Sequence, residues 1–456
     1  MSENVYQIDF NKPESVHFIG IGGISMSGLA EILMDEGFTV SGSDSHRSEL
    51  TDNLEARGAK VYIGQKAENI QDGIDVVVYT AAIHPDNPEF QEVKRRGIPM
   101  LTRAELLGEM MRNYKNAIAI AGTHGKTTTT SMVTEIFLQA KNDPTIAIGG
   151  NIRVGGPEFF VTEACEYTNS FLSFYPTMAV ILNIEEDHLD FFKDLADIRH
   201  SFKLFAERVP AQGAVVINGD IENYQEIIEA VKGKVITFGH SRGNDYSAGD
   251  IQYDNYAHPS FDLYIGGEKK ERLTLGVAGE HNVYNALAAI AVSLENGISM
   301  DAIRAGLAHF TGTNRRFEKK GEVNGFTIID DYAHHPHEIE ATLKTAQNYP
   351  HKTLWCIFQP HTYTRTKAFL PQFAEALSLA DKVILADIYA ARETDTLGIS
   401  SEDIVKLLKE KGKEAWYLPT FDEIEKFVME HCTQGDLLIT MGAGDVVNVG
   451  ENLLAK

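Results

Sequence analysis

Short apolar segments, each followed by a turn and then by a helix-like segment, recur along most of this sequence. Residues 16–19 precede Gly20, residues 117–121 precede Gly122, and residues 327–329 precede a polar cluster. Strands that alternate with helices in this way pair in parallel, because each helix returns the chain to the same end of the sheet. The sequence therefore predicts an α/β protein with parallel sheets.

The recurring units fall into three segments, which suits a chain of 456 residues. We expect domains over residues 1–113, 114–312 and 313–456. Within the second segment, the weak polar–apolar alternation of residues 240–275 predicts a small antiparallel excursion. The apolar periodicity of residues 282–296 predicts a helix that closes this segment.

Composition excludes several classes of protein. The chain carries 41 Lys and Arg against 65 Asp and Glu, a formal charge of −24, so a general basic surface for nucleic acid is not expected. The sequence contains no run of 18 apolar residues, so no membrane span is predicted. The three cysteines, Cys165, Cys356 and Cys432, lie far apart and predict neither a disulfide framework nor a zinc site. We expect a cytoplasmic protein.

The segment after the apolar strand at 117–121 has the composition of a phosphate-binding loop. It consists of Gly122, Thr123, His124, Gly125, Lys126, Thr127 and Thr128. Glycines let backbone N–H groups turn toward phosphate oxygens, Lys126 can reach the β- and γ-phosphates, and the Thr127 hydroxyl can ligate Mg²⁺. Ile120 stands where a strict Walker loop has its first glycine, so this loop is a shortened version. It predicts binding of a nucleoside triphosphate.

Candidate metal ligands follow two other predicted strands of the same segment. Glu163 ends one strand, and residues 183–188, which include three acids and His188, follow the next. In an open α/β sheet, ligands gather at the carboxyl ends of the strands. Oxygen groups beside a triphosphate suit Mg²⁺. The alternative is that these acids cap the helices that follow.

A second glycine-rich loop lies near the N-terminus. It contains Gly20, Gly22, Gly23, Ser25 and Gly28, and Asp44 follows the next strand at the distance where a ribose is usually bound. Ser25 occupies the third glycine position of a dinucleotide fingerprint, so the loop predicts a pyrophosphate without implying NAD. A nucleotide-sugar diphosphate fits the same loop, and tight strand–helix packing without a ligand is the structural alternative.

Polar clusters also follow the predicted strands of the third segment. Arg316 lies just before one such strand, Asp331 and His334 follow it, and Arg365 follows the next. Arginine and histidine can bind phosphate or carboxylate groups, and an aspartate can bind a ribose. No Ser-His-Asp or Cys-His arrangement supports a covalent hydrolase. Together with the two glycine-rich loops, these clusters suit an enzyme that joins two molecules at the expense of ATP. A nicotinamide-dependent oxidoreductase and a nucleotide-switched binding protein are the alternatives.

Taken together, the motifs resemble the Mur ligase family. They occur, in order, at residues 20–28, 122–129, 163–166, 183–188, 279–286, 315–317, 330–336 and 359–365. The resemblance covers nearly the whole chain. It implies an N-terminal Rossmann-like domain, a central P-loop-type ATPase domain with a parallel sheet, and a C-terminal Rossmann-like domain.

The resemblance also implies a reaction, in which ATP activates the lactyl carboxylate of UDP-N-acetylmuramate as an acyl phosphate and the amine of L-alanine displaces phosphate. It implies a monomer or a dimer that binds neither nucleic acid nor membrane. A ligase of the same family that recycles a murein tripeptide is the related alternative.

The resemblance assigns roles to particular residues. The residues implied to bind ATP are Gly122, Thr123, His124, Gly125, Lys126, Thr127, Thr128, Asn282, Asn285, Arg316 and Asp331. Those implied to bind the UDP-sugar and L-alanine are Gly20, Gly22, Gly23, Ser25, Gly28, Asp44, Thr80, His334 and Arg365. Thr127 and Glu163 would hold one Mg²⁺, and His188 would hold a second. The catalytic residues would be Lys126, His188, His334 and Arg365.

Overall fold

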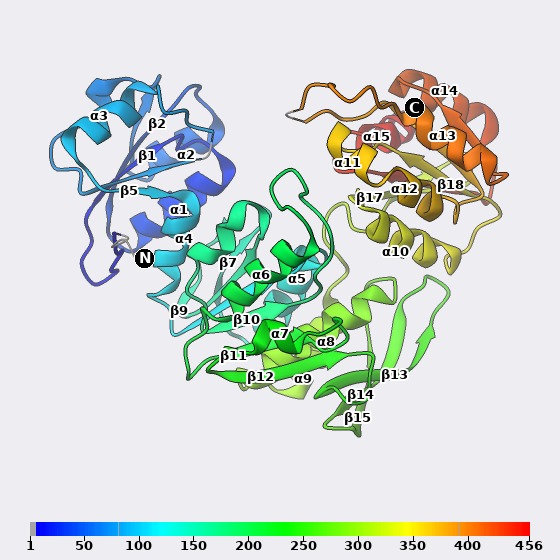
Figure 1. The fold of residues 1–456 in the computed structure, drawn as a ribbon, viewed down its shortest axis with the longest axis horizontal. Helices are drawn as coiled ribbons and strands as arrows, with labels where there is room; N and C mark the ends of the chain where they lie inside the picture. Colours follow the sequence, from blue (N-terminus) through cyan, green and yellow to red (C-terminus); the bar gives the residue numbers. More distant parts are fainter. Residues whose placement is uncertain (1–5, 81, 392) are drawn as a thin grey trace. The chain divides into compact units, whose positions relative to one another are not determined.

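The computed structural model describes residues 6–80, 82–391 and 393–456. The chain divides into two compact units. The first comprises residues 1–186, 194–238 and 288–303, and the second comprises residues 187–193, 239–287 and 304–456. Both units contain parallel strands that alternate with helices, as the sequence predicts (Figure 1). Among the helices described, none has both the length and the apolar character needed to cross a membrane.

The first unit begins with a five-stranded parallel sheet in the order β3-β2-β1-β4-β5. Its strands are β1 (Ser15–Ile19), β2 (Thr39–Asp44), β3 (Lys60–Ile63), β4 (Val76–Tyr79) and β5 (Met100–Thr102). Its helices are α1 (Ile24–Asp35), α2 (Glu49–Ala56), the 3₁₀ turn η1 (Ala67–Asn69), α3 (Pro88–Arg96) and α4 (Arg103–Met111). The chain order reverses beside β1, and this is where open α/β sheets bind ligands. The N-terminal glycine loop therefore lies at a favourable position.

The second sheet of this unit has the strand order β12-β11-β10-β6-β9-β7-β8 within the unit. The strands are β6 (Asn116–Ala121), β7 (Pro144–Ile148), β8 (Asn151–Arg153), β9 (Gly156–Ala164), β10 (Met178–Ile181), β11 (Ala214–Asn218) and β12 (Lys234–Gly239). Among the described pairings of these strands, only that of β7 with β8 is antiparallel. The helical elements are α5 (Lys126–Gln139), η2 (Tyr167–Ser173), α6 (Leu195–Ala206) and α7 (Gln225–Ile228). The phosphate loop leaves β6, which lies between β9 and β10.

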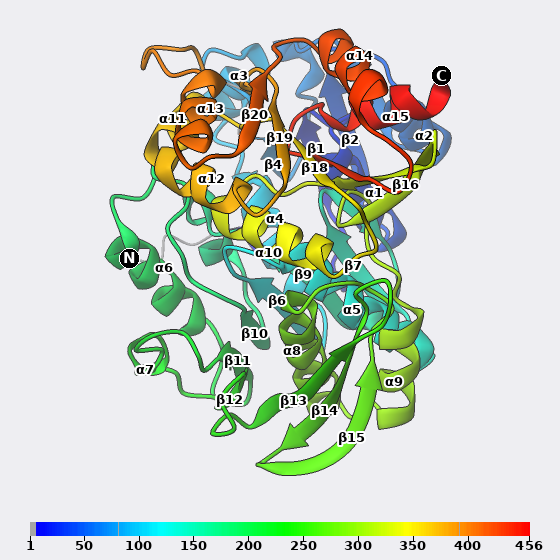
Figure 2. The ribbon, with the colours of Figure 1, turned by 90° about the vertical axis from the view of Figure 1, so that its right-hand side faces the viewer.

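The second unit contains the antiparallel excursion that the sequence predicts at residues 240–275. It consists of β13 (Tyr246–Tyr253), β14 (Pro259–Ile265) and β15 (Glu268–Thr274), which pair as successive hairpins (Figure 2). Two helices follow and have residues in both units: α8 (His281–Glu295) and α9 (Met300–His309). The predicted helix at 282–296 is thus confirmed within one residue at each end.

The largest sheet of the second unit has six strands in the order β16-β17-β21-β18-β19-β20. They are β16 (Glu318–Val323), β17 (Phe326–Asp331), β18 (Leu354–Phe358), β19 (Lys382–Leu385), β20 (Glu414–Tyr417) and β21 (Leu437–Met441). Among their pairings, only β16 with β17 is antiparallel. The helices are α10 (Pro336–Gln347), α11 (Tyr363–Ala368), α12 (Leu370–Leu377), α13 (Ser401–Glu410), α14 (Phe421–His431) and α15 (Val447–Ala455).

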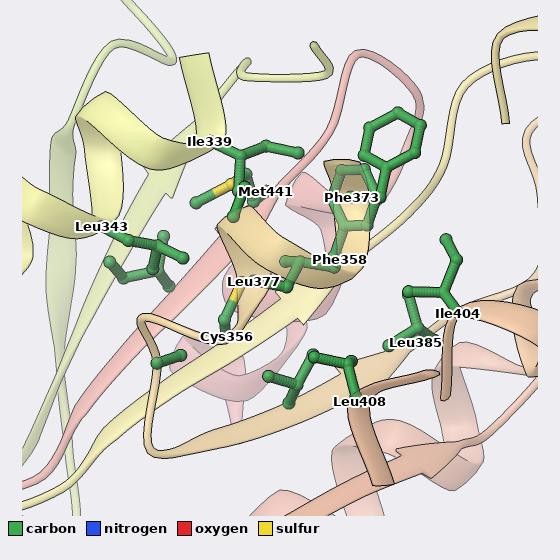
Figure 3. Packing of buried hydrophobic residues seen from close by; sticks show 14 of the residues in the cluster. Ile339, Leu343, Cys356, Phe358, Phe373, Leu377, Leu385, Ile404, Leu408 and Met441 are labelled. Carbon is green, nitrogen blue, oxygen red and sulfur yellow. The ribbon is translucent and has the colours of Figure 1, made fainter. Parts of the chain in front are cut away.

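Both faces of this sheet are buried, which explains why β18 and β21 read as continuous apolar runs. Cys356 and Phe358 pack on one face with residues of α10, α12 and α13, while Trp355 and Ile357 pack on the other. Figure 3 shows the first of these clusters, in which the rings of Phe358 and Phe373 lie 5.4 Å apart. Burying each such side chain stabilises the fold by about 1.5–3 kcal/mol. The packed sheet holds the polar loops at its carboxyl edge in place.

Candidate functional site

The phosphate loop connects β6 to α5 through two glycines that adopt positive φ. Gly122 has φ +149° and Gly125, which caps the N-terminus of α5, has φ +82°. A Cβ atom at Gly122 would lie 2.9 Å from Cβ of Leu182. Both positions therefore favour glycine. At Gly122 a side chain would clash with Leu182 and the φ is positive, and at Gly125 the φ is positive. The loop leaves the first turn of α5 without a side-chain cap, which suits an anion.

The loop that follows β10 braces the phosphate loop. The backbone N–H of His124 donates to Asn183 Oδ1 over 2.7 Å, and Asn183 Nδ2 donates back to the carbonyl of His124 over 3.1 Å. His124 Nε2 lies 2.9 Å from Glu185 Oε2. The backbone N–H of Glu185 also donates to Thr123 Oγ1 over 2.9 Å. Asn183 and Glu185, which the sequence places among candidate metal ligands, thus fix the shape of the phosphate loop.

Lys126, the first residue of α5, forms an ion pair with Glu166. Its ammonium group lies 3.0 Å from Glu166 Oε2 and also donates to the carbonyl oxygens of Gly122 and Thr123. Glu166 is 3% exposed and Lys126 is 18% exposed. Burial by itself lowers the pKa of Lys126, but the carboxylate of Glu166 outweighs it and the pKa lies above its ordinary value. The lysine is therefore charged and held at the mouth of the loop.

The residues present fit a magnesium ion at the carboxyl end of β9. Glu163 Oε1 is buried and has no hydrogen-bond partner among the described residues. Its other oxygen, Oε2, accepts one bond from the backbone N–H of Gly149 over 3.3 Å. A buried carboxylate oxygen without a partner is costly unless a cation or a donor meets it. Thr127 lies in the first turn of α5, and Thr128 beside it is buried.

The N-terminal glycine loop is closed by hydrogen bonds to the end of β2. The backbone N–H groups of Gly20 and Ile21 donate to the carbonyl of Ser43, over 2.8 and 2.9 Å. The backbone N–H of Gly22 donates to Asp44 Oδ2 over 2.9 Å. A Cβ at Gly22 would lie 2.8 Å from the same carboxylate oxygen. The structure thus brings Asp44 to the loop, as the sequence predicts.

Other residues expected at this loop lie around it. A Cβ atom at Gly20 would lie 2.8 Å from Cγ2 of Thr80, so these two residues are neighbours. Ser25 accepts a hydrogen bond from Arg103 over 3.1 Å. Gly23 caps the N-terminus of α1. Gly28 lies deeper, within α1, where its Cα faces Ile152 of β8; its role in the structure is to let this helix approach that strand.

In the second unit, the adjacent arginines Arg315 and Arg316 have different environments. Arg315 donates to Asp330 Oδ2 over 2.9 Å and to the carbonyl oxygens of Gly444 and Gly442 over 3.0 and 2.7 Å. Arg316 is 30% exposed, and its only ion pair within the described part of the chain, with Glu338, is 3.9 Å long. Arg315 therefore joins its own loop to β17 and to the loop after β21, whereas the guanidinium of Arg316 is more loosely held.

Asp331 organises the turn that carries Arg316. One carboxylate oxygen accepts from the backbone N–H of Phe317 over 2.7 Å and the other from that of Ala333 over 2.8 Å. Phe317 has φ +51°, so these bonds hold a backbone conformation that few residues adopt. Burial raises the pKa of Asp331 to about 6, although Arg316 and both N–H groups oppose this.

Arg365 forms a buried ion pair with Asp187, 178 positions away in the sequence. Its Nη2 lies 2.9 Å from Asp187 Oδ1, and its Nη1 lies 3.1 Å from Nδ1 of His361. Burial alone would raise the pKa of Asp187, but Arg365 outweighs it and holds that pKa well below its ordinary value. The backbone N–H of His188 donates to the same Asp187 oxygen over 2.8 Å. Arg365 and His188 are thus joined through Asp187.

His334 lies beside this group. Its ring centroid is 5.8 Å from that of His361, and its Nδ1 lies 3.1 Å from the carbonyl of Tyr332 and 3.3 Å from Glu338 Oε2. Burial lowers the pKa of His334 to about 4, with Arg365 adding to the effect and Glu338 opposing it. At neutral pH the ring is therefore uncharged, and one of its nitrogens can accept a hydrogen bond.

Asn282 and Asn285 lie on one face of α8, three residues apart. Asn282 Nδ2 donates to the carbonyl of Ala278 over 2.7 Å, and Asn285 Nδ2 donates to Asn282 Oδ1 over 3.0 Å. Each is 8% exposed. The two amides support each other in fixed orientations, which a base-binding surface requires.

Three residues that matter in this geometry were not among the predicted site residues: Glu166, Asn183 as a brace, and Arg103. Glu166 occurs three residues after Glu163, but no spacing rule connects it to Lys126. Arg103 opens a helix far from both glycine loops in the sequence. Only the capping pattern of Thr102 and Glu105, a capping box confirmed in the structure, could have indicated where that helix begins.

Three family models match the chain: the catalytic domain of the Mur ligase family at residues 15–115, the Mur ligase middle domain at 120–293, and the glutamate ligase domain of Mur ligases at 315–444. The chain belongs to the Mur ligase family. The matched regions correspond to the three sheets and bear out the predicted α/β class.

Among its relatives, the UDP-N-acetylmuramate–L-alanine ligase of Lachnospira eligens is 62% identical, over 99% of this chain and 100% of that protein. The ligase of the same name from Agathobacter rectalis is 60% identical with the same coverage. The crystal structure of the UDP-N-acetylmuramate–alanine ligase of Thermotoga maritima matches with a TM-score of 0.77 and 29% identity, over 97% of this chain and 98% of that one. A murein peptide ligase from Psychrobacter arcticus matches with a TM-score of 0.65 and 25% identity, over 97% and 98%.

Proposed function

We propose that this protein is an ATP-dependent ligase that joins L-alanine to the lactyl carboxylate of UDP-N-acetylmuramate, releasing ADP and phosphate, in the synthesis of peptidoglycan precursors. The observation that supports this most directly is the presence, in one compact unit, of two different anion-binding loops. One is the phosphate loop with Lys126, and the other is the N-terminal glycine loop closed by Asp44. Relatives that match over their full length carry the same activity in their names.

Activation of the carboxylate is assigned to the phosphate loop. A carboxylate is a poor acyl donor, and transfer of the γ-phosphoryl group converts it into an acyl phosphate with a good leaving group. Such a transfer depends on positioning and on charge neutralisation more than on a protein nucleophile. Lys126 supplies a positive charge at the loop, and the N–H groups at the start of α5 supply further donors.

Mg²⁺ is proposed at Thr127 and Glu163, whose donors are oxygens, and a second Mg²⁺ is proposed at His188. When bound, the ion would neutralise charge on the phosphates. The unpartnered Oε1 of Glu163 supports this assignment. Removal of Mg²⁺ with EDTA should abolish phosphate release, and addition of excess Mg²⁺ should restore it. Glu163→Gln should need a higher Mg²⁺ concentration for half-maximal rate; an unchanged requirement would contradict the assignment.

The remaining roles follow from chemistry in the second unit. Arg316 would bind the phosphates, Asp331 the ribose, and Asn282 with Asn285 the adenine. Arg365 would pair with the carboxylate of L-alanine. His334, whose ring is uncharged at physiological pH, would lie near L-alanine beside Arg365.

A second candidate function is the joining of a murein tripeptide to the same UDP-sugar, because a murein peptide ligase shares the fold. The two candidates differ in the acceptor. We therefore propose to measure phosphate release with ATP, Mg²⁺ and UDP-N-acetylmuramate while adding single amino acids or the tripeptide. Release that requires L-alanine supports the first function, release that requires the tripeptide supports the second, and release that requires neither contradicts both. Under either function, we propose that the protein is soluble and cytoplasmic.

A further inference from the structure

Arg103, the first residue of α4, directs its guanidinium to the N-terminal glycine loop. Its Nη1 donates to Oγ of Ser25 over 3.1 Å, although the two residues are 78 positions apart. The side chain is partly buried. Burial lowers the pKa of Arg103, and Cys165, which is close enough to interact electrostatically, opposes this shift.

Within the described part of the chain, Arg103 forms no ion pair with a carboxylate. Its one hydrogen bond there goes to the neutral hydroxyl of Ser25. The other enclosed arginines differ: Arg315 faces Asp330 at 2.9 Å, and Arg365 faces Asp187 at 2.9 Å. A guanidinium that is partly withdrawn from water is stabilised when an anion meets it. The environment of Arg103 therefore favours an anionic ligand.

The position of Ser25 indicates where that anion would lie. Ser25 is in the first turn of α1, whose N-cap, Gly23, offers no side-chain acceptor to the free N–H groups of that turn. A helix N-terminus of this kind attracts phosphate. Arg103 adds a planar set of donors beside the same turn, and such donors match two phosphate oxygens at once. Ser25, in the third glycine position of the fingerprint, holds the guanidinium there.

We propose that Arg103 binds the diphosphate of the UDP-sugar at the N-terminal glycine loop, with Ser25 orienting the guanidinium before the substrate arrives. The inference rests on the proposed function, since it assumes a UDP-linked substrate. It adds a ligand-binding residue from a different helix to the loop Gly20–Gly28 and Asp44. The lactyl carboxylate of the same substrate is the other anion that a guanidinium could bind. Free UDP has the diphosphate but no lactyl carboxylate, so its binding distinguishes these two anions.

The test is calorimetric titration of the full-length protein with UDP and, separately, with UDP-N-acetylmuramate. We expect Arg103→Gln to weaken UDP binding by about 10- to 100-fold, the range for a hydrogen bond to a charged group. Arg103→Lys keeps the charge but loses the paired donors, and should weaken it by about 5-fold. Arg95→Gln is the matched control and should leave UDP binding unchanged. It removes an arginine of α3, a helix beside the same sheet, whose side chain is 69% exposed.

Binding of MgADP reports on folding of the variants, because it depends on the other loop, and it should change less than about twofold. UDP binding that is unchanged in both Arg103 variants would overturn the proposal. Weakened binding of UDP-N-acetylmuramate with unchanged binding of UDP would overturn it in favour of the carboxylate. If wild-type protein binds no UDP, the proposed function itself fails. If Arg103→Gln does not fold, Arg103→Lys decides between these outcomes.

Discussion

The ammonium group of Lys126 lies 3.0 Å from Oε2 and 3.3 Å from Oε1 of Glu166, a carboxylate that is only 3% exposed. The two residues come from α5 and from the turn after β9. In the absence of nucleotide the carboxylate balances the charge of the lysine, and a triphosphate would compete for the same ammonium group. The ion pair therefore links the stability of the free protein to its affinity for nucleotide.

We expect removal of either partner to destabilise the nucleotide-free protein. Lys126→Met removes the cation that faces the buried Glu166 carboxylate and should lower the free energy of unfolding by about 3–5 kcal/mol. Lys126→Met combined with Glu166→Gln should recover at least about 2 kcal/mol of this loss, because no buried charge then remains. Urea unfolding of the four proteins of this cycle measures the coupling. Losses that simply add would show that the pair contributes nothing.

Glu166→Gln alone should bind MgADP more tightly, by about 3- to 10-fold, because the competing carboxylate and its repulsion of phosphate are gone. Titration calorimetry measures this. Glu158→Gln, which removes an exposed carboxylate from β9, is the matched control and should leave the affinity unchanged. Weaker binding in Glu166→Gln would mean that Glu166 positions Lys126 for the nucleotide instead of competing with it.

The adjacent arginines should separate stability from binding. Arg315→Lys cannot reproduce three contacts, to Asp330 and to the carbonyls of Gly442 and Gly444, and should lower the unfolding free energy by about 2–4 kcal/mol. Arg316→Lys should change it by less than about 0.5 kcal/mol. Thermal unfolding with and without MgADP checks both: only Arg316→Lys should lose part of the stabilisation by MgADP while its nucleotide-free stability is preserved. The reverse pattern would contradict these assignments.

Gly28→Ala should destabilise the first unit even though alanine favours helices. The added Cβ would lie 2.6 Å from Cβ of Ile152, which requires the helix or the strand to move. We expect a loss of about 1–3 kcal/mol. Gly23→Ala, where the nearest atom would be 3.6 Å away, should cost much less. Combining Gly28→Ala with Ile152→Ala should restore part of the loss in a thermal unfolding experiment; no restoration would refute the steric explanation.

His334 should make the protein less stable in acid. Burial lowers its pKa to about 4 in the folded state, from 6.5. Between these values the unfolded chain binds a proton that the folded protein excludes. The contribution of His334 is therefore complete above pH 6.5 and is lost as the pH falls toward 4, by at most about 3 to 4 kcal/mol. Urea unfolding across this range should show a shallower dependence for His334→Gln than for wild type. The exposed control His46→Gln should retain the wild-type dependence, and an unchanged slope in His334→Gln would contradict the prediction.

The elements could be predicted from sequence because each depends on contiguous residues. The apolar runs of β6 and β18, the glycines of the two loops and the helices that follow them are read directly along the chain. The antiparallel excursion and α8 were predicted in the same way. The neighbourhood of Asp44 and the glycine loop could also be predicted, because one βαβ unit brings the end of its second strand beside the first loop.

The partners of the charged side chains could not be predicted in this way. Arg315 and Arg316 are identical in type and adjacent in sequence, yet Arg315 contacts Asp330 of β17 and the loop after β21, whereas Arg316 has only a 3.9 Å ion pair with Glu338 among the described residues. Arg365 meets Asp187 across 178 positions. Gly28, which reads as part of a ligand loop, packs against Ile152.

The sequence by itself thus determined the α/β class, the two glycine-rich loops and the family, because backbone geometry at a strand, a glycine turn and a helix start is set by neighbouring residues. The tertiary structure alone decided that Lys126 faces Glu166, that Arg103 lies without a carboxylate beside Ser25, and that His334 is neutral. Charge balance and pKa depend on which groups packing brings within a few ångströms and on how much water it excludes, and neither is encoded in spacing along the chain.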